Sequence, residues 1–178
     1  MTANGIQRSF IDRMMGAARL DVGAYEEVEH DESATTQAII IVVLGAIASG
    51  IGALEGGIGG LLVGIVTALI GWAAYAYVAY WVGTNWFEGA QTSSTWGELL
   101  RTLGFASTPR LLLFLGIIPV LGYLVVLAVF IWLLATTVIA IRQALDFGTA
   151  RAITTAVVSW LALAIVSLVI TGIYVAAS

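Results

Sequence analysis

The stretch LLLFLGIIPVLGYLVVLAVFIWLLATTVIAI, residues 111–141, contains 31 residues and no charged side chain. As one α-helix it would be about 46 Å long, which is too long for a single crossing of a hydrocarbon core of about 30 Å. It is too short for two crossings unless the first begins earlier. Pro119 lies between Gly116 and Gly122 and offers a turn, because proline stops a helix and glycine relaxes the backbone. We therefore predict one span over 96–117 and the next over 119–141.

The composition of the whole chain indicates an integral membrane protein. Of the 178 residues, 60% are hydrophobic and 10% are charged, and the mean hydropathy is +1.01. Soluble domains carry about half apolar and about a quarter charged residues. The values exclude an ordinary water-soluble enzyme and an intrinsically disordered chain. The first partner that the composition implies is the lipid bilayer.

Charge and cysteine content exclude further classes. The net charge is −4, and all seven basic residues are arginine. Nucleic-acid binding needs a basic stripe that neutralises phosphates, so we expect no nucleic-acid partner. The chain has no cysteine, which excludes disulfides, thiolate metal sites and a cysteine nucleophile.

The chain divides into an N-terminal segment, 1–33, and a membrane domain, 34–178. In the first segment, apolar residues at helical spacing predict a short amphipathic helix at the membrane surface. These residues are Ile6, Phe10, Met14, Ala17 and Leu20. The acidic run 25–32 contains the only histidine, His30, but lacks the alternating ligands and the glycine of a calcium loop. We interpret this run as a solvated linker and predict no metal site.

The membrane domain has room for five spans of about 20 residues each. We place them at 34–54, 58–83, 96–117, 119–141 and 152–174. With five spans every arginine except Arg110 falls on one side, whereas four spans would put Arg142 and Arg151 opposite the N-terminus. The positive-inside rule then predicts a multi-pass cell-membrane protein with a cytoplasmic N-terminus and an external C-terminus. The expected fold class is all-α, with five transmembrane helices preceded by a short amphipathic interfacial helix.

A ridge of small residues marks the first connection between spans. Gly52, Gly56, Gly60 and Gly64 recur at every fourth position, a spacing that lets helices approach closely in lipid. The favoured interpretation is packing of the first two spans around a tight turn, and a homo-oligomer face is the alternative. The segment is not a nucleotide-binding loop, because it lacks the Lys-Ser/Thr ending.

The span over 96–117 carries Arg101, Pro109 and Arg110, so we expect it to be kinked or partly interfacial. Arg110 lies inside this span, well away from the cytoplasmic face. A buried arginine in lipid needs a charged partner or water, and Glu55 and Asp146 are the candidates. If Arg110 serves a conformational switch or an ion path, the protein is a small transporter or channel subunit. If the span is tilted or broken, Arg110 reaches the headgroups or caps a neighbouring helix end.

Enzyme signatures are missing from the sequence. It contains neither a Gly-x-Ser-x-Gly elbow nor a His-Glu-x-x-His zinc motif, and His30 is the only histidine available as a base. We therefore predict a protein that is not an enzyme, with no catalytic residue and no cofactor.

Several segments resemble the Yip family, five-span membrane proteins named for interaction with Ypt/Rab-type small GTPases, and follow its prokaryotic branch more closely. They are 25–31, then 99–109 with Gly104, Phe105 and Pro109, then 117–119 with Pro119, and 142–146 with Arg142 and Asp146 followed by Arg151. Phe105 stands where eukaryotic members carry the tyrosine of a Gly-Tyr-Ser element, and their Asp-Leu-Tyr-Gly-Pro signature is absent.

The resemblance implies a cytoplasmic N-terminal segment, five helices and an external C-terminus. For prokaryotic members it implies a non-enzymatic adaptor or organiser of membrane protein assembly or trafficking, with a membrane or cytoplasmic protein as partner. The loop 142–151 is then a candidate partner surface. The alternative is a topological role, in which arginines anchor the spans and Asp146 pairs with Arg142 at helical i,i+4 spacing.

Overall fold

The structure is a computed structural model that describes residues 8–50, 57–87, 94–118 and 120–177. Over these residues the chain forms seven α-helices and one long 3₁₀ helix, and no strand. They are α1 (Phe10–Ala18), α2 (Val22–His30), α3 (Ala34–Gly50), α4 (Gly57–Trp86), α5 (Trp96–Ala106), η2 (Thr108–Ile117), α6 (Leu121–Ala144) and α7 (Thr149–Ala177).

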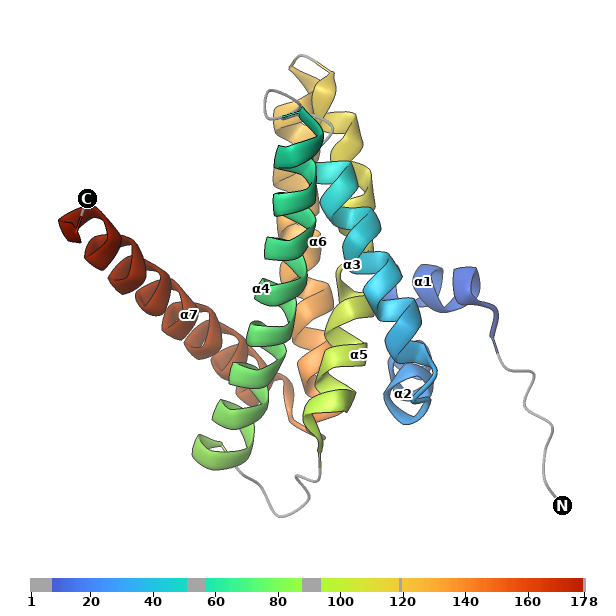
Figure 1. Cartoon of the computed structure of the whole chain (residues 1–178). Coiled ribbons are helices and arrows are strands. Elements are labelled where there is room, and N and C mark those ends of the chain that lie inside the picture. The colour runs from blue at the N-terminus through green and yellow to red at the C-terminus, as the bar shows by residue number, and fades with distance from the viewer. Residues whose placement is uncertain (1–7, 51–56, 88–93, 119, 178) are drawn as a thin grey trace, which may run out of the picture.

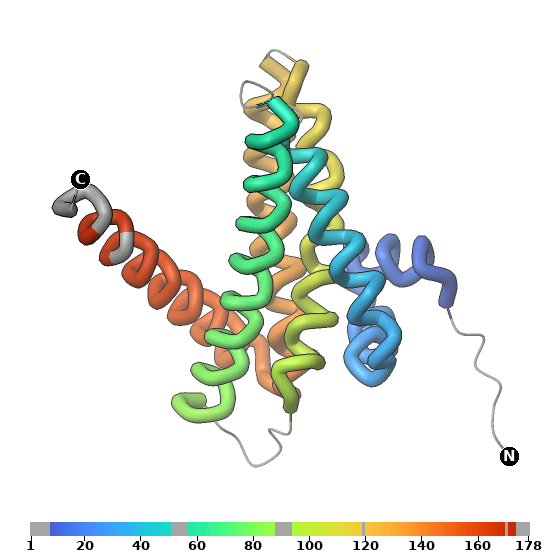
Figure 2. The backbone as a smooth tube through the Cα atoms, in the orientation of Figure 1, coloured from blue at the N-terminus to red at the C-terminus, as the bar shows by residue number. Residues whose placement is uncertain are grey.

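Helices α3, α4 and α6 and the α5–η2 pair run side by side as an elongated bundle (Figure 1). At one end α4 stops, α5 starts, and α6 gives way to α7; we call this the polar end. At the opposite, apolar end α3 stops, α4 starts, and η2 gives way to α6 (Figure 2). Helices α1 and α2 lie on one flank, and α7 leaves the bundle at an angle (Figure 1).

Among the described residues, three helices are long and apolar enough to cross a membrane, namely α4, α6 and α7. The described part of α3 has 17 residues, and with α2 it forms a pair bent by 119° that would count as a fourth crossing if it were one broken span. The prediction of an all-α integral membrane protein is thereby confirmed. The predicted spans 58–83, 119–141 and 152–174 coincide closely with α4, α6 and α7.

The predicted span over 96–117 is two elements instead of one α-helix. α5 ends at Ala106, and Pro109 lies in the first turn of η2. Proline at this position lacks the N–H that would continue the α-helical ladder, so the chain changes its winding here. Because a 3₁₀ helix rises about 2.0 Å per residue and an α-helix about 1.5 Å, the two elements together extend about 36 Å. The expected kink in this segment is therefore present, as a break after Ala106.

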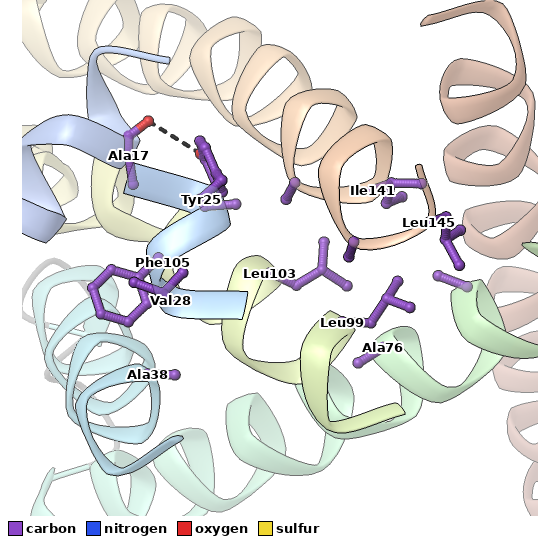
Figure 3. Close-up of a cluster of buried hydrophobic side chains, with 14 of the residues drawn as sticks. Ala17, Tyr25, Val28, Ala38, Ala76, Leu99, Leu103, Phe105, Ile141 and Leu145 are labelled. Carbon is purple, nitrogen blue, oxygen red and sulfur yellow. Dashed lines mark hydrogen bonds between the residues drawn. The ribbon is translucent and has the colours of Figure 1, made fainter. Parts of the chain in front are cut away.

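Burial is concentrated toward the polar end. Buried apolar side chains from α1 to α6 meet there, and Tyr25 donates a hydrogen bond from its hydroxyl to the carbonyl of Ala17, 3.1 Å away (Figure 3). Most of the large exposed apolar side chains belong to 58–70 of α4, 112–134 of η2 and α6, and 153–173 of α7, and smaller numbers lie on α1, on α3 and around the end of α4. Apolar surface of this extent on a single chain marks a partner surface, here the lipid that the composition implies.

The small-residue ridge does not hold the first two spans together over its described part. A Cβ built on Gly60 or Gly64 would meet no atom within 4 Å. The prediction of close packing between the two spans is therefore wrong at these two positions, because other residues of α4 face α3. Gly52 and Gly56 lie outside the described residues. The homo-oligomer alternative stays a prediction.

Candidate functional site

Arg13 joins three helices at the flank of the bundle. Its side chain is 1% exposed, and its guanidinium lies 2.9 Å from a carboxylate oxygen of Glu27 and 2.7 Å from one of Asp31. It also donates a hydrogen bond to the Gln37 side chain, at 3.2 Å. Glu27 lies in the last turn of α2 and Asp31 is its C-cap, so the C-terminal end of this helix presents both acids to the same cation. Arg13 on α1 thus fixes the end of α2 and the start of α3.

Arg101 on α5 caps the C-terminus of α2. Its Nε donates to the carbonyls of Val28 and Glu29, at 3.0 and 3.1 Å, and its Nη2 also donates to the Glu29 carbonyl. The last carbonyls of a helix have no donor within the helix, and a cation there also interacts favourably with the helix dipole. Arg101 is 7% exposed. The orientation of α2 against α5 is therefore set by a buried charge-assisted contact.

An acidic cleft of about 660 Å³ opens beside this contact. Its walls come from α2, the first turn of α5 and the end of α6 with the turn after it. The lining residues are Gly23, Glu26, Glu27, Glu29, His30, Glu98, Gln143 and Asp146. Gln143 donates to Glu26 across the cleft, at 3.3 Å. Glu98 Oε2 accepts from the backbone N–H of Thr95, at 2.8 Å, which completes the capping box of α5.

Glu29 is the most unusual group in the cleft. It is 7% exposed, and its carboxylate forms no hydrogen bond or ion pair with any residue in the described ranges. Burial raises the pKa of Glu29 to about 7, because removal from water disfavours the charged form. His30 lowers this pKa, and the neighbouring acids raise it further; these acids are Glu98, Asp146 and Glu26.

His30 lies at the exposed rim of the cleft. Its Nδ1 lies 2.8 Å from the carbonyl oxygen of Glu26, and this hydrogen bond is the largest cause of a raised His30 pKa. No group of three His, Cys, Asp or Glu side chains in the described parts of the chain is arranged to hold a metal ion. The cleft is thus a broad, negatively charged concavity and not a closed coordination shell.

The family-model comparison can now be set beside this geometry. The model of the Yip1 domain matches residues 22–171. The chain belongs to the Yip1 domain family. The match begins at the first residue of α2 and covers every helix that lines the acidic cleft. Comparison with curated proteins and with solved structures finds no match.

Two of the resemblance motifs lie in the core of the Yip1 domain. A Cβ on Gly104 would stand 2.5 Å from Ala38 Cβ and 3.2 Å from Trp72, so α3 and α4 approach α5 closely because this residue is glycine. Phe105 is fully buried and packs edge-on against Phe10, with ring centroids 6.4 Å apart. Both residues therefore act through packing. Pro119 lies outside the described residues.

Arg110 lies in η2 against α3. A Cβ built on Gly45 would be 3.1 Å from Arg110 Cβ, so the arginine stem runs over a glycine surface. Over the described residues Arg110 forms no ion pair, and the pairing with Asp146 considered from the sequence is wrong, because Asp146 lines the acidic cleft at the polar end. Glu55 lies outside the described residues.

The loop between α6 and α7 also differs from the helical pairing considered from the sequence. α6 ends at Ala144, and Asp146 has a φ of +52°. The helical path that would bring Asp146 over Arg142 is therefore interrupted, and no ion pair joins them. Arg142 Nε instead donates to the side chain of Gln143, at 3.1 Å. Arg151 is exposed in the first turn of α7.

The acidic run 25–32 is not the solvated linker that we predicted. Its residues up to His30 belong to α2, which Asp21 caps by accepting from the Gly23 N–H at 3.0 Å. Tyr25 and Val28 on this helix are fully buried. The roles of Arg13 and Arg101 were also missed, because the groups that each arginine binds lie far from it in the sequence. The i,i+4 spacing of Glu27 and Asp31 was the available signal for a buried cation.

Proposed function

We propose that this Yip1-domain chain is a non-enzymatic adaptor or organiser of membrane protein assembly or trafficking. The observation that carries the proposal is the construction of the polar end. A polar surface is fixed to an apolar bundle by two buried arginines, Arg13 and Arg101, which tie α1 and α2 to the bundle helices. A surface held this firmly can bind a partner without first having to be ordered.

The proposal includes an orientation, with the polar end in the cytoplasm of a cell membrane. Arg101, Arg142 and Arg151 belong to the helix ends that meet there, and Arg13 holds α2 beside them. An arginine excess next to span ends is typical of the cytoplasmic side. The described helix ends at the apolar end, near 50, 57 and 121, carry no arginine.

Co-purification tests the adaptor function. The protein is extracted from its native membranes in mild detergent, and bound proteins are quantified by mass spectrometry. Gly148→Trp adds bulk to the candidate partner surface 142–151, and Gly172→Trp adds the same bulk on α7; a Cβ at either position meets no atom within 4 Å. We expect a stoichiometric partner with wild type and with Gly172→Trp, and less of it with Gly148→Trp.

Two other outcomes would change this account. Equal recovery with Gly148→Trp would contradict the loop 142–151 as the partner surface and leave the adaptor function in place. Recovery of no stoichiometric partner, together with substrate-dependent flux in liposomes that Arg110→Leu abolishes, would replace the adaptor with a small transporter or channel subunit.

A further inference from the structure

The unpaired carboxylate of Glu29 is not explained by the packing of the polar end. The other acids around Arg13 have a structural role, because Glu27 and Asp31 pair with that arginine. Glu29 contributes only its backbone carbonyl to such a contact, through Arg101. Its side chain lines the acidic cleft, is 7% exposed, and has no hydrogen-bonding partner over the described residues. The described residues supply no donor to this carboxylate, whose oxygens reach solvent through the cleft, so a ligand that enters the cleft can supply the donors that these residues do not.

The cleft has the wrong form for a metal ion. A calcium site needs about six to eight oxygens that converge within about 2.6 Å of one point. The described residues contain no group of three His, Cys, Asp or Glu side chains in such an arrangement. The volume of about 660 Å³ is also many times that of one water molecule, which takes about 30 Å³ in the liquid. The space suits a side chain or a short stretch of chain.

The charge of the lining selects a cation. Carboxylates come from three sides of the cleft, with Glu26 and Glu29 on α2, Glu98 on α5 and Asp146 after α6. Glu98 uses Oε2 in the capping box, so its other oxygen is available to a ligand. No lysine or arginine lines the cleft. Anionic lipid headgroups would be repelled there, whereas a guanidinium or ammonium group would be attracted.

We propose that the acidic cleft binds an arginine or lysine side chain of a basic segment in a protein partner, with the carboxylates of Glu29 and Glu98 accepting hydrogen bonds from its nitrogens. The inference deepens the proposed function and rests on it for the existence of a partner. An arginine fits the site especially well, since its planar fork reaches two carboxylates at once and such charge-assisted bonds are about twice as strong as neutral ones.

A defined peptide tests the inference without knowledge of the partner. The purified full-length protein in neutral detergent is titrated into fluorescein-labelled hexa-arginine, and binding is followed by fluorescence anisotropy at pH 8. Hexa-citrulline, which has nearly the same shape without the charge, is the control peptide. Glu29→Gln and Glu98→Gln each remove one charge from the cleft, and glutamine keeps the capping box at position 98. Glu32→Gln removes the same charge from an exposed position outside the cleft.

We expect hexa-arginine to bind and hexa-citrulline not to bind. Glu29→Gln and Glu98→Gln should each raise the Kd by about ten-fold or more, while Glu32→Gln should change it less than two-fold. Equal weakening by all three substitutions would overturn the inference, because it would show attraction by net charge alone. Absence of peptide binding, or Glu29-dependent binding of Ca²⁺ or Mg²⁺ instead, would also overturn it. A stoichiometric partner that still co-purifies with Glu29→Gln would leave the adaptor function intact.

Discussion

Glu29→Gln should make the folded protein more stable above neutral pH. Burial raises the pKa of Glu29 from 4.5 to about 7, so between these values the folded state binds a proton that the unfolded state has released. Folding stability therefore falls as the pH rises from about 4.5 to about 7 and is level above that. A shift of one pKa unit corresponds to about 1.4 kcal/mol, so the full loss is about 3 kcal/mol.

Water in the open cleft screens part of this loss. We therefore expect the free energy of unfolding of Glu29→Gln to exceed that of wild type by about 1–3 kcal/mol at pH 8, and by much less at pH 5. The pKa of His30 is also raised, so His30 likewise lowers the folding stability as the pH rises. Because this loss occurs in wild type and in Glu29→Gln alike, it largely cancels in the stability difference between them. The assay is unfolding in detergent followed by tryptophan fluorescence at pH 5, 6, 7 and 8.

The exposed Glu32 supplies the matched control. Glu32→Gln makes the same chemical change one residue after the C-cap of α2, and we expect the wild-type pH profile. The reasoning would be refuted by a stability difference between Glu29→Gln and wild type that stays constant from pH 5 to pH 8. It would equally be refuted if Glu29→Gln were less stable than wild type at pH 8, because the charged form would then be the favoured one.

Four further substitutions test the packing by the same unfolding assay, and Arg101→Met is also tested by limited proteolysis. Gly104→Ala should destabilise the protein by about 1–3 kcal/mol, because the new Cβ overlaps Ala38. At Gly64 the new Cβ meets open space, so Gly64→Ala should stabilise the protein by up to about 1 kcal/mol. Equal effects of the two substitutions would contradict the close approach of α5 to α3. Arg13→Met should destabilise the protein by about 2–4 kcal/mol, since two carboxylates lose their cation. A free energy of unfolding within about 0.5 kcal/mol of wild type, the range of ordinary surface substitutions, would contradict the three-helix junction. Arg101→Met should cost about 1–3 kcal/mol through the uncapped carbonyls of α2, and unchanged protease sensitivity of α2 would contradict that cap.

The sequence allowed the apolar part of the fold to be predicted because its signals are local. A charge-free run broken by Pro119 and an arginine asymmetry are visible without tertiary contacts, and α4, α6 and α7 follow the predicted spans. Pro109 likewise predicted a disturbed segment, and the chain changes from α-helix to 3₁₀ helix there.

The polar end could not be predicted, because long-range contacts decide it. The acids of 25–32 resemble a solvated linker when they are seen alone. They form part of a helix because Arg13 and Arg101, the latter more than 70 residues away, bind its carboxylates and carbonyls. The acidic cleft follows from that placement of α2, since Glu98 and Asp146 become neighbours of Glu29 only when α5 and the end of α6 pack beside it.

The central claim is that the polar end faces the cytoplasm, where a partner can reach it. Because the chain has no cysteine, single introduced cysteines can be labelled with a membrane-impermeant maleimide without background. Gly148→Cys marks the polar end, and Tyr123→Cys, at a side chain 86% exposed, marks the apolar end. The account predicts that intact cells label only Tyr123→Cys and that inverted vesicles label only Gly148→Cys. Labelling of Gly148→Cys in intact cells would contradict it.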